Sequence, residues 1–295
     1  MNGGYLKQIL CIVIGIVLIS LSSLAWATPA QAADRFRCFQ PDSSIRGCNS
    51  KTALSEFCNE PPTAGEPSCC QDTSEDRKDY SIDSPAPNGS EVIVIAIHGG
   101  GIESFTSEIG LKLANSRNWD HYIFSGHGRS QCLLGRSNFR TLHITSHRFN
   151  HQKAIDLVNS HSKSVSIHGY LQATRPDYPA GVICVGGKNE KQIEAFINYV
   201  KANSAAFSSQ DGGYELHPID TPKAESKGMS GYCVEPEPAL TGTNDYNIVN
   251  RNSEEQGLQL ELSSTMRKNL GRPDKPSHKT LQTIIFGAID EAMGV

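Results

Sequence analysis

The sequence predicts an α/β fold, a mostly parallel or mixed sheet with helices on both faces, and three observations support this class. Short apolar or β-branched runs alternate with stretches of helical periodicity over residues 91–295, the pattern of strand–helix–strand units. The run at 92–97 is continuously apolar, as expected of a strand buried on both faces. This run ends at a histidine and three glycines before the next helical pattern, a position at which open α/β sheets bind ligands.

The composition is that of a folded protein with a slightly acidic balance. The chain has 295 residues, of which 38% are hydrophobic, and this length suits one large or two modest domains. A disordered chain is excluded by this hydrophobic content together with a net charge of only −4. The acidic balance also argues against a general nucleic-acid-binding protein, so we expect no nucleic-acid partner.

Residues 1–32 have the pattern of an export signal. Lys7 supplies a positive charge, residues 9–21 form an apolar run, and Ala30-Gln31-Ala32 is a small-residue cleavage site. The run is short for a membrane-spanning helix. We therefore expect cleavage after Ala32, a secreted or periplasmic location, and no stable membrane insertion after cleavage. An uncleaved anchor is the alternative.

The segment that follows the signal is rich in cysteine. Residues 33–75 hold five of the eight cysteines that remain after cleavage, and such clustering in an exported chain indicates a small disulfide-rich N-terminal extension. Residues 76–90 are charged and then rich in Pro, Ser and Asn, which is typical of a linker. The main domain is expected at 91–295. The five clustered cysteines are Cys38, Cys48, Cys58, Cys69 and Cys70.

Three cysteines lie within the main domain. Cys184 is part of an apolar strand pattern, so we expect a buried free thiol there. Cys132 and Cys233 pair with each other or with the N-terminal cluster. Sequence alone leaves that choice open.

The order of strands and helices in the main domain follows from periodicity. The clearest helix is 190–203, with Ile193, Phe196, Ile197 and Val200 at helical spacing. Residues 204–250 carry few signals and are expected to be mostly loops. The expected strands are 92–97, 121–124, 141–146, 165–167, 181–187, 214–217 and 258–263, and the expected helices are 103–116, 150–160, 190–203 and one capped by Ser277.

Two strand ends present residues that suit a zinc ion. His98 and Glu103 flank the glycine turn after the first strand and offer a nitrogen and a carboxylate to one ion. His168 likewise follows a short apolar strand and precedes a glycine, so it belongs at the same edge of the sheet. Three protein ligands plus water is the arrangement of catalytic zinc, and we predict one Zn²⁺ per chain. The alternative is that these side chains only bind loop backbone.

Glu261 is the candidate general base. Residues 258–263 alternate strictly, so Glu261 faces away from the leucines of its strand. A carboxylate inside a sheet that is buried on both faces needs a reason. Its functional interpretation is transfer of a proton from water to the leaving amine. The alternative is an edge strand with Glu261 in solvent.

A local excess of positive charge predicts an anionic ligand. Residues 121–151 contain four arginines and five histidines but no Asp or Glu. Guanidinium groups pair bidentately with carboxylates, so Arg129 and Arg140 are candidate substrate-binding residues. Arg267 lies just past the strand of Glu261 and is a candidate for binding a substrate carboxylate or the developing oxyanion. A solvated basic surface is the alternative.

His147 has two possible roles. In the expected strand 141–146 and its continuation, His143, Thr145 and His147 share one face. His147 is therefore a candidate substrate-binding residue. It is also the main competitor to His168 as third metal ligand.

Five short motifs in order carry a resemblance to a known family. Over roughly residues 90–293 the chain resembles the phage-type poly-γ-glutamate hydrolases. The resemblance implies a zinc-carboxypeptidase-like α/β fold and cleavage of γ-glutamyl amide bonds. It also implies that His98, Glu103 and His168 bind one zinc and that Glu261 is the catalytic carboxylate. The motifs are His98-Gly-Gly-Gly-Ile-Glu103, Leu142-His-Ile-Thr-Ser146, Ser166-Ile-His-Gly169, Val185-Gly-Gly187 and Gln259-Leu-Glu-Leu-Ser263.

These features together predict a secreted zinc hydrolase acting on an anionic γ-glutamyl polymer or peptide. The phage enzymes are compact, whereas this chain has an export signal and a cysteine-rich extension. This difference leaves the expected fold and metal site unchanged, but it allows a substrate other than poly-γ-glutamate. One alternative is a non-catalytic exported binding module on the same fold. Another is a zinc amidase that acts on peptidoglycan peptides.

Overall fold

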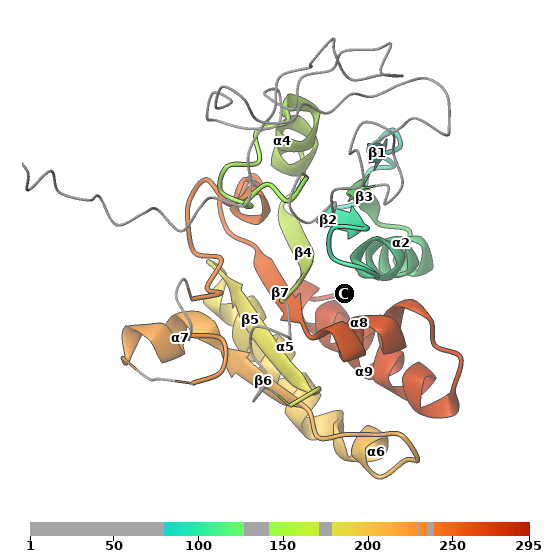
Figure 1. Cartoon of the computed structure of the whole chain (residues 1–295). Coiled ribbons are helices and arrows are strands. Elements are labelled where there is room, and N and C mark those ends of the chain that lie inside the picture. Colours follow the sequence, from blue (N-terminus) through green and yellow to red (C-terminus); the bar gives the residue numbers. More distant parts are fainter. Residues whose placement is uncertain (1–79, 127–141, 171–178, 229–230, 235–238) are drawn as a thin grey trace, which may run out of the picture. The chain divides into compact units, whose positions relative to one another are not determined.

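The computed structural model describes residues 80–126, 142–170, 179–228, 231–234 and 239–295 (Figure 1). Several predictions lie outside these residues: the signal peptide, the cysteine-rich extension, Cys132, and the arginines Arg129 and Arg140. Within the described residues, no helix combines the length and the apolar character that a membrane-spanning helix needs.

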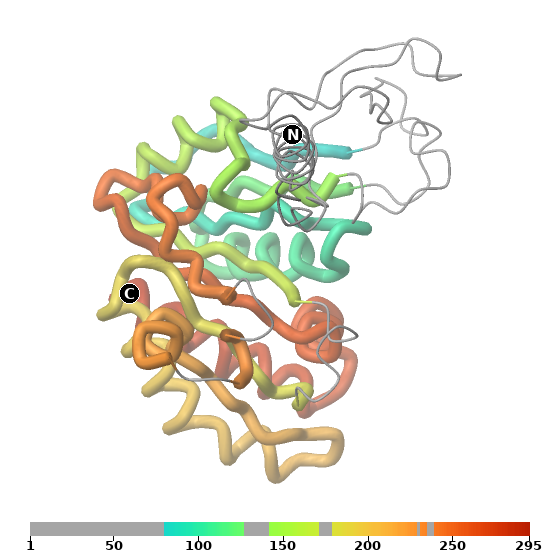
Figure 2. The backbone as a smooth tube through the Cα atoms, turned by 60° about the vertical axis from the view of Figure 1, so that its left-hand side comes forward, coloured from blue at the N-terminus to red at the C-terminus, as the bar shows by residue number. Residues whose placement is uncertain are grey.

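The described strands form one mixed sheet in the order β1-β3-β2-β4-β7-β5-β6. The strands from β3 to β7 in this order are parallel, whereas β1 is antiparallel to β3 and β5 is antiparallel to β7. In Figure 2 the orange-red β7 runs between the yellow-green β4 and the yellow β5. The strands are β1 Tyr80–Asp83, β2 Val92–Gly100, β3 Asp120–Gly126, β4 Lys163–Gly169, β5 Val182–Gly187, β6 His217–Asp220 and β7 Leu258–Leu262.

Helices cover both faces of this sheet, as the sequence predicts (Figure 1). One buried cluster joins residues of α2, α5, α8 and α9 to alternate residues of the central strands. On the opposite face, α4 and the short η4 pack on Ile93, Ile95 and Ile97 of β2. The helices are α2 Thr106–Arg117, α4 Gln152–Asn159, α5 Glu190–Asn203, α6 Ala205–Ser208, α7 Thr221–Ser226, the 3₁₀ helix η4 Ile248–Asn250, α8 Ser264–Gly271 and α9 Pro276–Met293.

The two central strands β4 and β7 carry polar side chains on one face only. Their apolar residues alternate into the large core cluster, which confirms the alternation expected at 258–262. The register of the parallel pair sets His168 beside Glu261 and Ser166 beside Gln259. All four side chains are buried. A buried polar stripe of this kind needs internal hydrogen-bond partners, because water does not reach it.

Part of the expected linker belongs to the sheet. Tyr80–Asp83 lie inside the segment 76–90, and they form β1, which pairs with β3. Tyr80 is fully buried and stacks on Phe124. The folded domain therefore includes residues upstream of 91. Its first strand is too short and too polar to stand out in the sequence.

The prediction of a strand at 141–146 is wrong. Residues 142–149 form turns, closed by a hydrogen bond from the backbone N–H of Phe149 to the carbonyl of Thr145 at 3.1 Å. Leu142 and Ile144 nevertheless pack into the apolar cluster beside β2. The sequence alternates apolar and polar residues here as a strand would, although Leu142, His143 and Ile144 are all buried. The sixth strand is also displaced: it was expected at 214–217 and lies at 217–220 in the structure.

The disulfide corrects two further expectations. Cys184 is not a free thiol, because it forms a disulfide with Cys233, and Cys233 therefore pairs with neither Cys132 nor the N-terminal cluster. The prediction that Glu261 lies inside the sheet is confirmed, and its edge-strand alternative is excluded, because β7 is flanked by β4 and β5. Its carboxylate is therefore a buried group that requires polar partners.

Candidate metal centre

A tight turn after β2 brings Glu103 back over His98. The backbone N–H of Glu103 donates to the carbonyl of His98 at 2.8 Å, which closes the turn. Gly100 lies in the left-handed region at φ 63°, and a Cβ there would overlap the carbonyl oxygen of Gly126. The glycine run is therefore needed to place a carboxylate directly beside the imidazole that ends the strand.

His98 directs one ring nitrogen toward the centre. Its Nε2 donates to the carbonyl of Ile144 at 2.8 Å, and its Nδ1 lies 2.9 Å from Oε1 of Glu103. A carbonyl only accepts, so Nε2 carries a proton, and in the neutral ring the lone pair is therefore on Nδ1. A backbone carbonyl that fixes the tautomer of a histidine is the usual partner of a metal-binding imidazole.

His168 faces His98 from the neighbouring strand. The two Nδ1 atoms are 3.0 Å apart, and Nδ1 of His168 is 3.8 Å from Oε2 of Glu103. Nε2 of His168 lies 2.8 Å from the hydroxyl of Ser166, which can accept a hydrogen bond from it. When each ring is neutral with its proton on Nε2, the two Nδ1 lone pairs face each other beside a carboxylate, and a cation between them would stabilise this arrangement.

The donor set fits zinc. Zinc ligands at about 2.0–2.1 Å in a tetrahedral arrangement lie roughly 3.3 Å from one another. Nδ1 of His98 lies 2.9 Å from Oε1 of Glu103 and 3.0 Å from Nδ1 of His168, and the latter lies 3.8 Å from the other carboxylate oxygen, Oε2. These separations bracket that value. Two nitrogens and a carboxylate are also among the ligands that zinc prefers.

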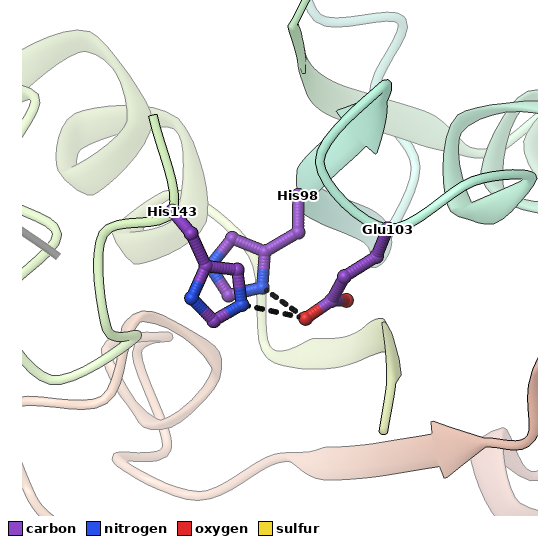
Figure 3. Close-up of side chains that lie close together, drawn as sticks. All are labelled: His98, Glu103 and His143. Atoms are coloured by element: carbon purple, nitrogen blue, oxygen red, sulfur yellow. Dashed lines mark hydrogen bonds and ion pairs between the residues drawn. The ribbon is translucent and has the colours of Figure 1, made fainter. Parts of the chain in front are cut away.

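His143 is the site residue that sequence reasoning missed. It lies in the turn after residue 141, and its Nε2 is 2.7 Å from Oε1 of Glu103, while its ring stacks on His98 with centroids 3.8 Å apart (Figure 3). Candidate ligand atoms of His98, Glu103 and His143 all lie within 4.8 Å of one another. One feature of the sequence could have identified His143. It is a polar residue between Leu142 and Ile144, and because these two pack into the apolar cluster, the side chain of His143 points away from that cluster.

The partners of Glu103 hold it ionised. Burial raises the pKa of this carboxyl. When His98 is protonated on both nitrogens, its charge and the hydrogen bonds from His143 and His98 outweigh that effect and leave the pKa well below its usual value. The backbone N–H of Gly169 also donates to Oε2 of Glu103 at 2.7 Å. Burial and the charge of His98 lower the pKa of His168 to about 3. A charged carboxylate beside a neutral imidazole is the state that binds a metal ion.

Glu261 lies on the next strand, on the same face as His168. The two residues are direct register partners across β4 and β7. Glu261 is 9% exposed, and its Oε1 accepts a hydrogen bond from Nε2 of Gln259 at 3.3 Å. The fold therefore places this carboxylate beside the candidate metal centre, although no local sequence pattern joins the two strands.

Arg267 packs under the same edge of the sheet. Its Nε donates to the carbonyl of Ser104 at 3.0 Å, and its Nη1 donates to the carbonyl of Leu262 at 2.9 Å. It is 5% exposed, and a Cβ at Gly169 would overlap its guanidinium. Burial lowers the pKa of this guanidinium, and the nearby carboxylates of Glu103 and Glu261 oppose that shift. These contacts tie together the ends of three strands.

Of the four residues proposed to bind substrate, the structure describes only His147 and Arg267. His147 lies in the turn after residue 145 and is half-buried. It is His143 rather than His147 that reaches Glu103. Substrate binding by His147 and Arg267 stays a prediction, as does that by the two arginines outside the described residues.

Proteins of Bacillus subtilis (strain 168) and two solved structures are similar to this chain. The SPbeta prophage-derived UPF0714 protein YoqZ is 30% identical over 61% of this chain and 51% of its own length. The UPF0714 protein YndL is 30% identical over 66% of this chain and 62% of its own length. This chain thus spans about half to two-thirds of the length of these relatives.

The structural comparisons agree on the fold. A bacteriophage poly-gamma-glutamate hydrolase superposes with a TM-score of 0.54 at 23% identity, over 76% of this chain and 93% of its own. A zinc-free apo form of YndL superposes with a TM-score of 0.52 at 23% identity, over 72% and 91% of the two chains. The sequence model of the poly-gamma-glutamate hydrolase family matches residues 70–218 and 221–287, and this chain therefore belongs to that family.

Proposed function

We propose that this protein is a secreted zinc-dependent hydrolase that cleaves the γ-glutamyl amide bonds of poly-γ-glutamate. The observation that carries the proposal is the approach of two imidazole Nδ1 atoms and one carboxylate at a single sheet edge, with a second buried carboxylate on the adjacent strand. Membership of the poly-gamma-glutamate hydrolase family supports the substrate.

His98, Glu103 and His168 are the ligands in this proposal. Their donor atoms face one another with proton positions that suit a cation. His143 instead donates its Nε2–H to Glu103, because its ring stacks on His98 rather than directing a nitrogen between His98 and His168. A zinc ion held there supplies a Lewis acid for the amide carbonyl and lowers the pKa of water. A relative in the same family has been solved in a zinc-free form, which supports this choice of metal.

Glu261 acts as the proton carrier. It removes a proton from the attacking water and delivers it to the nitrogen of the leaving amine. Its position beside His168 on the adjacent strand supports this role, as does its burial, which keeps bulk water from competing for the proton.

The basic character of residues 121–151 supports an anionic substrate. Poly-γ-glutamate carries one free α-carboxylate per residue, and guanidinium groups bind carboxylates bidentately. In the proposal Arg129, Arg140 and His147 hold these carboxylates on either side of the bond to be cleaved, and Arg267 keeps the strand ends in place.

Export is part of the same proposal. The disulfide between Cys184 and Cys233 supports folding in an oxidising compartment, because disulfides are rare in reducing ones. If export occurs as proposed, N-terminal sequencing of the mature protein will give a chain that starts at Ala33. A mature protein that retains Met1 would contradict it.

Hydrolysis of the polymer tests the activity. Purified protein is incubated with poly-γ-glutamate, with and without a chelator, and polymer length and new amino groups are measured. We expect shortening in the untreated sample only. Glu261→Gln is expected to lose activity but keep its zinc. The matched control is Glu254→Gln, which makes the same change at an exposed position on the preceding loop and should behave as wild type.

The remaining outcomes separate the alternatives. An unchanged polymer together with new amino termini in digested peptidoglycan would replace the substrate and keep the chemistry. A protein that binds zinc and the polymer, yet turns over neither substrate, would be a binding module. Full activity in the Glu261→Gln variant would remove the proton carrier from the proposal.

A further inference from the structure

We propose that Asn247 and Gln259 form a hydrogen-bonded relay that fixes the orientation of the Glu261 carboxylate. Both are positioning residues, since they act through Glu261. The inference rests on the proposed function, because it takes Glu261 as the proton carrier. It is carried by the direction of three consecutive hydrogen bonds between buried groups.

The relay starts at a backbone group whose role is fixed. The N–H of Val249 donates to Oδ1 of Asn247 at 3.2 Å, at the beginning of the 3₁₀ helix η4. A backbone N–H can only donate, so the oxygen of this amide must face Val249. The Nδ2 group of Asn247 then points the other way, and it donates to Oε1 of Gln259 at 2.8 Å.

The orientation is passed on through Gln259. Because its Oε1 accepts from Asn247, its Nε2 must point along β7, where it donates to Oε1 of Glu261 at 3.3 Å. Asn247 and Gln259 are each 4% exposed, so water cannot substitute for either partner. A flipped amide at either position would place two acceptors face to face.

Close packing holds the amide of Gln259 in place. A Cβ on Gly242 would lie 2.8 Å from Cδ of Gln259 and 2.9 Å from its Oε1, so the backbone of Gly242 lies directly against this group. Asn250 in turn binds the carbonyl of Gly242 through its Nδ2 at 2.7 Å. The loop 242–250 therefore works as a rigid support for the relay.

A fixed carboxylate plane has a chemical purpose. Proton transfer requires the accepting oxygen within hydrogen-bond reach of the water, and a displacement of about 1 Å costs on the order of 100-fold in rate. Holding Oε1 of Glu261 sets the direction of Oε2. The neighbouring strand uses the same device, because Ser166 contacts Nε2 of His168 from two residues upstream.

The variant Asn247→Asp tests the relay. It keeps the size of the side chain and the acceptor for Val249, but it replaces the donor to Gln259 by a second acceptor. The amide of Gln259 is then driven to flip, and its oxygen faces Glu261. We expect kcat on poly-γ-glutamate to fall about 10- to 100-fold, with KM within about twofold of wild type and zinc content unchanged.

The matched control is Asn244→Asp. It makes the same change of charge in the same loop, at an exposed residue whose side-chain oxygen accepts from the N–H of Tyr246 and so keeps its contact. Its kcat should equal that of wild type. If Asn247→Asp fails to fold, Gln259→Leu removes the same link without adding a charge and should show the same loss of kcat.

A second cycle separates positioning from general stability. In a Glu261→Gln background, Asn247→Asp should leave the residual rate unchanged, because there is no longer a carboxylate to orient. Wild-type kcat in the single variant, or an equal further loss in that background, would overturn the proposal.

A readout without turnover keeps the relay testable if the proposed function fails. Should the wild-type protein leave the polymer intact, the side-chain amide protons of Gln259 are followed by NMR. We expect them to be protected from hydrogen exchange in wild type and to lose protection in Glu261→Ala. Rapid exchange in wild type would overturn the relay independently of the activity.

Discussion

His143 and His168 contact the same carboxylate in different ways, and a metal-binding experiment distinguishes them. His168→Ala removes a proposed ligand and should abolish stoichiometric zinc binding. His143→Ala removes only a hydrogen bond to Glu103, and outer partners of this kind are worth about 10- to 100-fold in affinity. Zinc content and competition with a chromophoric chelator measure both effects. Stoichiometric zinc in His168→Ala with none in His143→Ala would make His143 the third ligand.

The buried state of His168 predicts a pH dependence of stability in the chelator-treated protein. Its pKa is lowered from 6.5 to about 3, so below pH 6.5 the unfolded chain takes up a proton that the folded chain does not. The free energy of unfolding therefore falls as the pH decreases from 6.5. Between pH 7 and pH 5 we expect a loss of about 2 kcal/mol from this residue.

Urea unfolding at pH 7 and pH 5 checks this expectation. Glu103 takes up only about a fifth of a proton in the unfolded chain by pH 5, and this contribution is shared by wild type and His168→Gln. Wild type should lose about 2 kcal/mol more over this interval than His168→Gln, which lacks the titrating ring. Equal losses in the two proteins would contradict it.

Gly169 has no room for a side chain. A Cβ there would overlap the guanidinium of Arg267, and the N–H of Gly169 donates to Glu103. Gly169→Ala should therefore lower the free energy of unfolding by about 1–3 kcal/mol, the usual cost of overpacking, and should weaken zinc binding. Urea unfolding and chelator competition measure the two effects.

A double-mutant cycle identifies the cause. When Arg267→Ala is combined with Gly169→Ala, the added methyl group no longer meets the guanidinium. The two unfolding penalties should then sum to more than the penalty of the double variant. Strict additivity would show that the strain at residue 169 has another source.

Among the elements, the turn after α7 that contains Cys233 is joined to β5 by a disulfide. The disulfide joins residues separated by 49 positions, and a closed loop of this length is worth about 4 kcal/mol through the entropy of the unfolded chain. Replacing both cysteines by alanine should therefore lower the free energy of unfolding by about 4 kcal/mol. Thermal and urea unfolding of the double variant test this, and unchanged stability would mean that strain in the folded state cancels the gain.

The alternation of β7 predicts the face on which Glu261 lies, whereas no such pattern marks His143 or Asn247. Strict alternation of leucines with polar residues assigned the face of Glu261 correctly. The helix 190–203 was likewise fully specified by its spacing. Turns leave weaker traces: His143 lies in a segment whose apolar and polar residues alternate in the sequence, but the segment is not a strand. Asn247 lies in a loop where no periodicity marks it.

At the scale of the whole domain, the edge strand β1 sets where the folded part of the chain begins. β1 covers β3 and buries Tyr80 completely. A chain that begins at residue 91 exposes the edge of β3 and the ring of Phe124, and unpaired edges promote aggregation. We expect it to unfold at lower temperature than the full chain and to aggregate. Tyr80→Ala in the full chain should cost roughly 3 kcal/mol or more, as for other buried aromatics.

Light scattering and thermal unfolding measure these two changes. A chain from residue 91 with unchanged stability would restore the linker interpretation of residues 76–90.

The fold class was predictable from the sequence, but the strand order was not. Alternating strands and helices imply a parallel or mixed sheet, which the structure has. The position of β7 between β4 and β5 depends on contacts between distant segments, which no local pattern encodes. That position alone brings Glu261 beside His168. The proposed ligands His98 and His168 at the ends of β2 and β4 were easier to identify, because each follows an apolar run and precedes a glycine.

The contact between Gly169 and Arg267 also constrains how this family diverges. A chain that gains any side chain at 169 must shorten the residue at 267, and it then needs another group to bind the carbonyls of Ser104 and Leu262. The two positions should therefore covary among homologues: a long cation at one and glycine at the other, or neither. Homologues that keep arginine beside alanine would have to move a strand end, and with it the carboxylate of Glu103.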